Sequence, residues 1–165
     1  MRNYASLNLV APPVIEISIK ESLDWAEDKA CIESILRLFV NYLFEGERSL
    51  SVYITHDAEI RLNNHEHRGM DQPTDILSWS YVEDDPESEW IGEMMLSLDR
   101  VRVQAAENGW DVRTELIRLL AHGCAHIAGW DHERSEEEAQ QMLKLEIQLL
   151  QSAGYENLYP EKLKE

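Results

Sequence analysis

The sequence predicts a single α+β domain, with about four strands in one mixed sheet packed against about five helices. Three observations predict this class. Short β-branched or alternating runs are interleaved with longer segments in which apolar residues recur at helical spacing. Glycine or proline separates most of these segments. No internal repeat, linker or low-complexity tract divides the 165 residues, so we assign residues 1–165 to one domain.

Four segments have the composition of strands. Pro12 and Pro13 precede the first, which is rich in isoleucine, and the second alternates β-branched and aromatic residues. The third is followed by an acidic run that ends at Pro86. The predicted strands are Val14–Lys20, Leu50–Thr55, Thr74–Tyr81 and Ile91–Leu98.

Five segments have the periodicity of helices. The first is a long pattern that opens at Ser22 and is closed by Gly46. Asp57 is expected to cap the second, and Ser135 with Glu138 forms a capping box ahead of the last. The other predicted helices are Asp57–Asn64, Asp99–Asn108, Asp111–Ala128 and the segment after Ser135.

Composition limits the class of function. The net charge is −17, from 32 acidic and 15 basic residues, which disfavours non-specific nucleic-acid binding because such a surface repels polyanions. The two cysteines, Cys31 and Cys124, make no disulfide framework and are expected to be reduced thiols. The first fourteen residues lack the pattern of a signal peptide, and no stretch is apolar enough to span a bilayer. We therefore expect a cytoplasmic protein without a membrane partner.

The segment from His122 to His132, which reads H-G-C-A-H-I-A-G-W-D-H, predicts a metal site. An α-helix turns about 100° per residue, so His122 and His126 differ by only about 40° in direction and can bind one ion. Gly129 then ends the helix and lets the chain return, so that His132 reaches the same ion. Cys124 points about 200° away from His122 and is expected to pack in the core.

This ligand set favours a catalytic site. Three protein ligands leave a fourth tetrahedral position open, as in catalytic zinc sites. Nitrogen donors favour zinc over magnesium or calcium, while nickel, cobalt and iron stay open. The alternative is that these are ordinary helix and loop histidines. Three of the six histidines fall within eleven residues around a glycine, which favours the metal interpretation.

The same spacing occurs in the metzincin proteases, but one residue differs. Those enzymes have a glutamate directly after the first histidine as general base. Here that position is Gly123, which has no side chain. The difference points away from peptide hydrolysis. A glutamate introduced at position 123 is expected to lie near the metal and to repel a phosphate.

The motif closely resembles the H-G-x-L-H-L-x-G-Y-D-H signature of the YbeY family of bacterial metal-dependent endoribonucleases. Residues 68–78, R-G-M-D-Q-P-T-D-I-L-S, resemble a second family motif, R-G-x-D-x-P-T-D-V-L-S-F. Residues 92–97, G-E-M-M-L-S, resemble a third, G-D-I-V-I-S. The resemblance runs from about Leu62 to Tyr155, and the first sixty residues fit only in element order.

The resemblance implies zinc at His122, His126 and His132, and an arginine in the cleft, here Arg68, that is needed for cleavage. It implies single-stranded RNA as substrate, and roles in 16S ribosomal RNA 3′-end maturation and ribosome quality control. The ribosomal small subunit or assembly factors are then the expected partners. A guanidinium is always charged and can donate two hydrogen bonds to a phosphate, which suits this role. The alternative for Arg68 is a surface arginine paired with Glu66 or Asp71.

Two other functions stay open. One is a zinc hydrolase of another class, peptidase-like or deaminase-like, which Gly123 and the lack of a C-x-x-C pair disfavour. The other is a non-catalytic, zinc-containing ribosome-assembly adaptor. Asp131 is expected either to orient a ligating imidazole or to stabilise a turn. The acidic composition suggests weak binding to free RNA and the need for a partner that presents the strand.

Overall fold

The computed structural model describes residues 12–159. The ends of the predicted domain and most of the segment examined for a signal peptide lie outside this range. The strands are β1 (Ile15–Ile19), β2 (Ser49–Thr55), β3 (Ile76–Ser80) and β4 (Trp90–Ser97). The helices are α1 (Lys29–Leu43), α2 (Asp57–Arg68), α3 (Leu98–Asn108), α4 (Val112–Ile127) and α5 (Glu136–Ser152).

The four strands form one mixed sheet in the order β1-β2-β4-β3. β1, β2 and β4 run parallel, and β3 pairs with β4 in the antiparallel direction. Parallel neighbours need a crossover connection, which α1 provides between β1 and β2. The predicted α+β class, with four strands and five helices, is confirmed.

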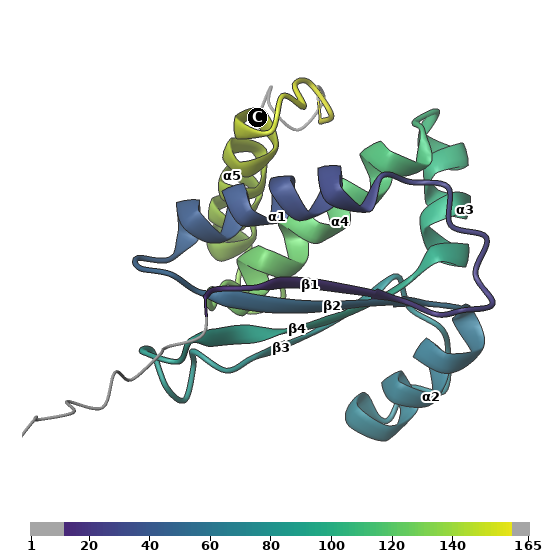
Figure 1. Ribbon diagram of the computed structural model, residues 1–165, viewed down its shortest axis with the longest axis horizontal. Coiled ribbons are helices and arrows are strands. Elements are labelled where there is room, and N and C mark those ends of the chain that lie inside the picture. The colour runs from purple at the N-terminus through teal and green to yellow at the C-terminus, as the bar shows by residue number, and fades with distance from the viewer. Residues whose placement is uncertain (1–11, 160–165) are drawn as a thin grey trace, which may run out of the picture.

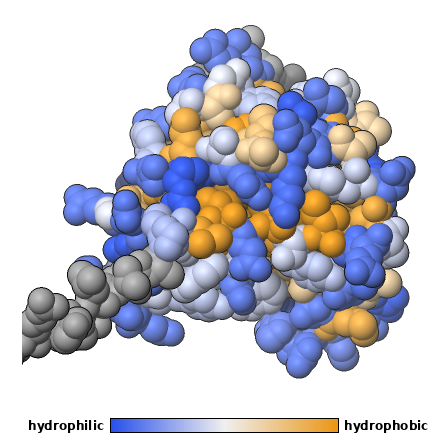
Figure 2. All heavy atoms as spheres, in the orientation of Figure 1, coloured by the Kyte–Doolittle hydropathy of each residue, from blue (hydrophilic) through white to orange (hydrophobic). Residues whose placement is uncertain are grey.

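The helices form layers on the two faces of the sheet. In Figure 1, α1, α4 and α5 lie over one face, α3 stands at one end, and α2 lies on the opposite side. The core fills the space between the sheet and the first group of helices, with Phe39, Leu36 and Leu120 fully buried. Hydrophilic side chains cover most of the face shown in Figure 2, interrupted by small hydrophobic groups. Within residues 12–159, no helix combines the length and the apolar character needed to cross a membrane.

Helix α1 begins at Lys29, so the predicted start at Ser22 was wrong. Asp28 is the N-cap residue, and its carboxylate accepts hydrogen bonds from the backbone N–H groups of Ala30 (3.0 Å) and Cys31 (3.3 Å). The segment before it forms turns, and its apolar side chains pack against the core without being helical. The capping side chain determines where the helix begins, whereas hydrophobic spacing alone had predicted an earlier start.

Helix α2 is one turn longer than predicted. It continues past Asn64 to Arg68 and ends at Gly69, whose φ of 69° is left-handed. Asp57 does not cap it, because its carboxylate instead accepts hydrogen bonds from Ser97 (2.6 Å) and Arg100 (3.1 Å). Arg68 is therefore held by the last turn of a helix, four residues beyond the predicted helix end at Asn64.

Two glycines let α4 lie close to β3 and β4. A Cβ atom on Gly92 would lie 2.2 Å from the backbone oxygen of Trp79 and 3.1 Å from Cδ1 of Ile127 on α4. A Cβ atom on Gly123 would lie 2.4 Å from Sδ of Met94 and 2.7 Å from the Ile76 side chain. These contacts leave no room for a methyl group at either position.

We expect Gly92→Ala to lower the free energy of unfolding by about 1–3 kcal/mol, because the new methyl group meets backbone that has no room to move. Gly123→Ala should lower the free energy of unfolding by less, because the atoms it meets lie near the ends of flexible side chains. In addition, alanine favours a helix over glycine by about 1 kcal/mol. Urea denaturation of both variants measures the difference. A larger loss for Gly123→Ala than for Gly92→Ala would contradict this packing.

Candidate metal centre

His122 and His126 lie one turn apart on α4 and face the same cavity. Their ring centroids are 4.6 Å apart, and their Nε2 atoms are 3.1 Å apart. The opposite side of the helix is buried, and Cys124 has no exposed surface. Burial raises the pKa of the Cys124 thiol to about 12. Cys124 therefore belongs to the core, as the sequence predicted.

His132 returns to the same place through a reversal of the chain after α4. Gly129 has a φ of 102°, and the backbone N–H of Trp130 donates to the carbonyl of Ala125 (3.1 Å). The ring centroid of His132 lies 5.2 Å from those of both other histidines. The potential ligand atoms of the three residues all lie within 4.8 Å of one another, so the group can hold a metal ion.

The nitrogen donors fit a transition metal such as zinc. Tetrahedral zinc–nitrogen bonds of about 2.0–2.1 Å place neighbouring ligand nitrogens about 3.3 Å apart. The Nε2 atoms of His122 and His126 are already close to this separation. The group therefore needs little rearrangement to bind an ion, while the identity of the metal is left open by these contacts.

Each helical histidine has its Nδ1 atom fixed by an acceptor. The Nδ1–H of His126 donates to the backbone carbonyl of Trp130 (2.8 Å). The Nδ1–H of His122 donates to the carboxylate of Glu146 on α5. Because carbonyl and carboxylate oxygens accept hydrogen bonds, both Nε2 atoms keep a free lone pair directed at the shared point.

The electrostatic surroundings keep His126 neutral. Burial lowers its pKa, and the neighbouring His122 lowers it further, against a smaller opposing effect of the hydrogen bond to Trp130. A neutral imidazole is the form that binds a metal ion.

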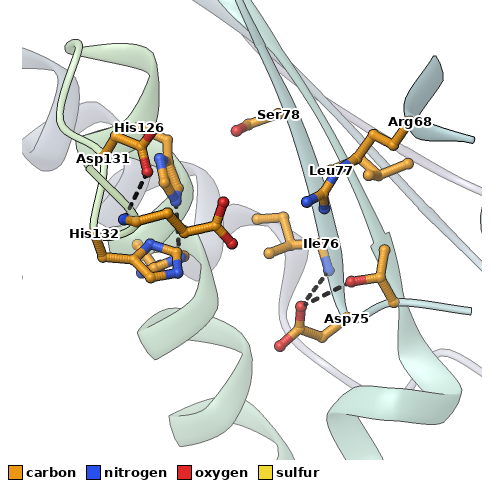
Figure 3. Close-up of a pocket in the computed structure, with 11 residues that line it drawn as sticks. Arg68, Asp75, Ile76, Leu77, Ser78, His126, Asp131 and His132 are labelled. Atoms are coloured by element: carbon orange, nitrogen blue, oxygen red, sulfur yellow. Dashed lines mark hydrogen bonds between the residues drawn. The ribbon is translucent and has the colours of Figure 1, made fainter. Parts of the chain in front are cut away.

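Arg68 lines the opposite side of the cavity. The cavity has a volume of about 430 Å³ and is bounded by the three histidines, residues 74–78 and Arg68. Figure 3 shows the Arg68 side chain directed into this space from the β3 side, across from His126 and His132. Asn64 helps to hold this end of α2, because its amide donates to the carbonyl of Gln72 in the following loop (2.8 Å).

The carboxylates expected to compete for Arg68 lie elsewhere. Asp71 pairs with Arg61 (2.8 Å), and this pairing lowers the pKa of Asp71. In the part of the chain that the structure describes, neither Glu66 nor Asp71 forms an ion pair with Arg68. The predicted alternative of a paired surface arginine is therefore not what the structure shows.

Asp131 stabilises the turn and does not orient a ligand. Its carboxylate accepts a hydrogen bond from the backbone N–H of Glu133 (2.9 Å), which is the main cause of its lowered pKa. Its own N–H donates to Glu138 (3.1 Å), which ties the reversal to the start of α5. Of the two roles considered for Asp131, the turn role is the one present.

The sequence interpretation missed Glu146, the carboxylate that does contact a histidine of the group. The signal was available, because Glu146 lies four residues after Met142 and four before Leu150, on the buried stripe of the last helix. An acidic residue on an apolar face needs a polar partner, so this position was a candidate for a site.

Position 123 carries a packing constraint that the sequence did not reveal. The first atom of a side chain there would meet the side chains of Met94 and Ile76, between α4 and the sheet, so a glutamate at this position would require both to move. The close packing of α4 on the sheet is therefore one reason for a glycine at position 123.

Comparison with known proteins identifies the family. The model of the family "Endoribonuclease YbeY" matches residues 15–154. Endoribonuclease YbeY of Persephonella marina is 36% identical over 135 residues, which cover 81% of this chain and 88% of that protein. The protein of the same name from Neorickettsia sennetsu is 33% identical over 138 residues, covering 83% and 95%. A solution structure of a Thermotoga maritima protein matches with a TM-score of 0.57 and 25% identity, covering 83% of this chain and 88% of that one. The chain therefore belongs to the YbeY family of endoribonucleases.

Proposed function

We propose that this protein is a single-strand-specific, metal-dependent endoribonuclease that acts in 16S ribosomal RNA 3′-end maturation and ribosome quality control in the cytoplasm. The observation that carries the proposal is the placement of three converging histidines and an exposed arginine around one open cavity. The family supplies the reaction class, and the cavity offers the groups that such a reaction needs.

In this proposal His122, His126 and His132 hold one zinc ion. When bound, such an ion supplies Lewis-acid chemistry to a phosphoryl oxygen. The histidines leave one side of the site open toward the cavity, where a substrate can enter.

Arg68 binds the phosphodiester from the other side. A phosphodiester gathers negative charge on its non-bridging oxygens as it reacts, and a guanidinium donates two parallel hydrogen bonds to such oxygens. Because Asp71 is engaged by Arg61, Arg68 keeps its donors available for the phosphate. The last turn of α2 holds the Arg68 backbone, which limits how far the guanidinium moves.

The position of the site favours an unpaired strand. The scissile phosphate has to enter between the histidines and Arg68, and a single strand can bend its backbone into such a cavity while a rigid duplex resists bending. The net charge of −17 opposes binding of free RNA at long range. We therefore propose that the small ribosomal subunit or an assembly factor presents the strand.

We expect one metal ion per chain, and we expect His126→Ala to lose it, because two remaining ligands hold zinc poorly. Elemental analysis of the purified protein after gel filtration measures the content. His65→Ala, which changes an exposed histidine on α2, serves as control and should keep the metal. Unchanged zinc in His126→Ala would refute the proposed site.

Arg68→Ala is expected to keep its fold and metal but to lose about 10²–10³-fold in cleavage rate, the range found when one donor to a transition-state oxyanion is removed. Arg68→Lys should recover little of the rate, since a point charge lacks the two-pronged geometry. Arg102→Ala is the control, because it removes an exposed arginine on α3 that does not line the cavity. If Arg68→Ala cleaves at the wild-type rate, Arg68 is a surface residue.

Substrate preference gives a direct test of the proposed reaction. The purified protein should cleave single-stranded RNA, including a 16S precursor 3′ end, faster than a duplex of the same sequence. Chelation followed by gel filtration should abolish cleavage, and added zinc should restore it. Equal cleavage of both RNAs would exclude single-strand specificity, and full activity after metal removal would exclude metal dependence.

A further inference from the structure

We propose that Glu146 is a positioning residue for the metal centre, holding His122 in the tautomer and orientation that direct Nε2 at the ion. This inference rests on the proposed function, because it takes the three histidines to be metal ligands. It adds a residue from α5 to a site otherwise built from α4, the reversal after it, α2 and the start of β3.

Glu146 is buried, and the structure places its carboxylate on a ligand. The residue is 6% exposed, and its carboxylate accepts a hydrogen bond from Nδ1–H of His122 on the neighbouring helix. Met142, Leu149 and Leu150 are buried around it on α5 and fix the position of its backbone. The carboxylate is therefore held in place before any metal arrives.

This hydrogen bond decides which nitrogen of His122 can bind a metal. An ionised carboxylate only accepts hydrogen bonds, so Nδ1 carries the proton and Nε2 presents its lone pair. That Nε2 lies 3.1 Å from Nε2 of His126, at the point where the ligand group converges. Without an acceptor at Nδ1, the ring could take the other tautomer, which places a hydrogen at the metal position.

Glu146 differs from a structural buried glutamate in the residue that it contacts. Glu115, a fully buried glutamate on α4, receives two hydrogen bonds from the Arg118 guanidinium, at 2.9 Å and 2.5 Å. That pair balances its own charge within the fold. Glu146 instead contacts the imidazole of His122, and a carboxylate hydrogen-bonded to a metal-ligating imidazole makes that imidazole a stronger donor to a cation.

The Nδ1 atoms of the two helical histidines therefore have acceptors of different strength. His126 donates to the neutral carbonyl of Trp130, which belongs to the chain reversal after α4. His122 donates to a carboxylate, a stronger acceptor, from a different helix. Loss of Glu146 should therefore weaken metal binding by changing His122, while His126 and His132 keep their places.

The test compares Glu146→Gln, Glu146→Leu and the control Glu115→Gln. Zinc affinity is measured by competition with a chromophoric chelator, at a temperature where each variant is folded. Removing a group that orients a metal ligand typically costs about 10–100-fold in affinity. We expect about tenfold weaker binding in Glu146→Gln, whose amide oxygen can still accept, and about a hundredfold in Glu146→Leu. Glu115→Gln should lower stability but keep the wild-type affinity.

A second measurement reports on His122 without metal. Nitrogen-15 NMR of the metal-free protein, at a pH where histidine is neutral, should show the Nδ1–H tautomer of His122 in wild type and in Glu115→Gln. In Glu146→Leu the ring should shift toward the Nε2–H form. A purely structural role for Glu146 would move the unfolding midpoint without moving either readout.

The outcomes separate this inference from the proposed function. Wild-type zinc affinity in Glu146→Leu, with the His122 tautomer unchanged, would overturn the positioning role and leave the metal centre intact. A wild-type protein that binds no zinc would instead refute the metal centre, and with it the role of Glu146. Weaker binding in both Glu146 variants together with an unchanged control would support the proposal.

Discussion

Helix α4 carries two of the three histidines, and it can approach β3 and β4 only because residues 92 and 123 have no side chains. This close packing sets the distance between the histidines and Arg68, which comes from α2 at the far side of β3. A shift of about 1 Å in α4 would move both helical histidines together, away from any phosphate held by Arg68. The packing of apolar residues on the sheet is therefore what fixes the geometry of a polar site.

The histidine group is held from three directions. The core side of α4 is fully buried, and each such Leu or Ile contributes about 1.5–3 kcal/mol from burial, which offsets the cost of ordering the helix. The reversal at Gly129 is tied to α5 through Glu138, and α5 reaches His122 through Glu146. Rings fixed in this way need little reorganisation to accept an ion, and binding then costs less conformational entropy.

The sequence predicted the order of the elements and the metal-ligand group because both depend on local geometry. Helical spacing, a glycine stop and a third histidine ten residues after the first suffice to place His122, His126 and His132 together. One error arose where a tertiary contact competed with a local signal. Asp57 has the character of a helix cap, but Ser97 and Arg100 engage its carboxylate. The end of α2 could have been predicted, because Gly69 follows a basic last turn, and this would have placed Arg68 on the helix. The contact of Glu146 with His122 could not, because it depends on how α5 packs on α4.

Position 123 shows why a shared ligand spacing does not define a reaction. In metzincins the residue after the first histidine is the general base, and the spacing of the three histidines is the same as here. The spacing follows from the pitch of a helix and a glycine stop, so any protein that needs three imidazoles on one ion can arrive at it. In this fold the next residue is a glycine, and a Cβ atom there would meet the side chains of Met94 and Ile76. The group across the cavity is an arginine, which can stabilise a phosphate but cannot accept a proton from water. The ligand spacing therefore explains how an ion can be held, whereas the reaction class follows from the family, and Arg68 across the cavity is a group that can bind a phosphate.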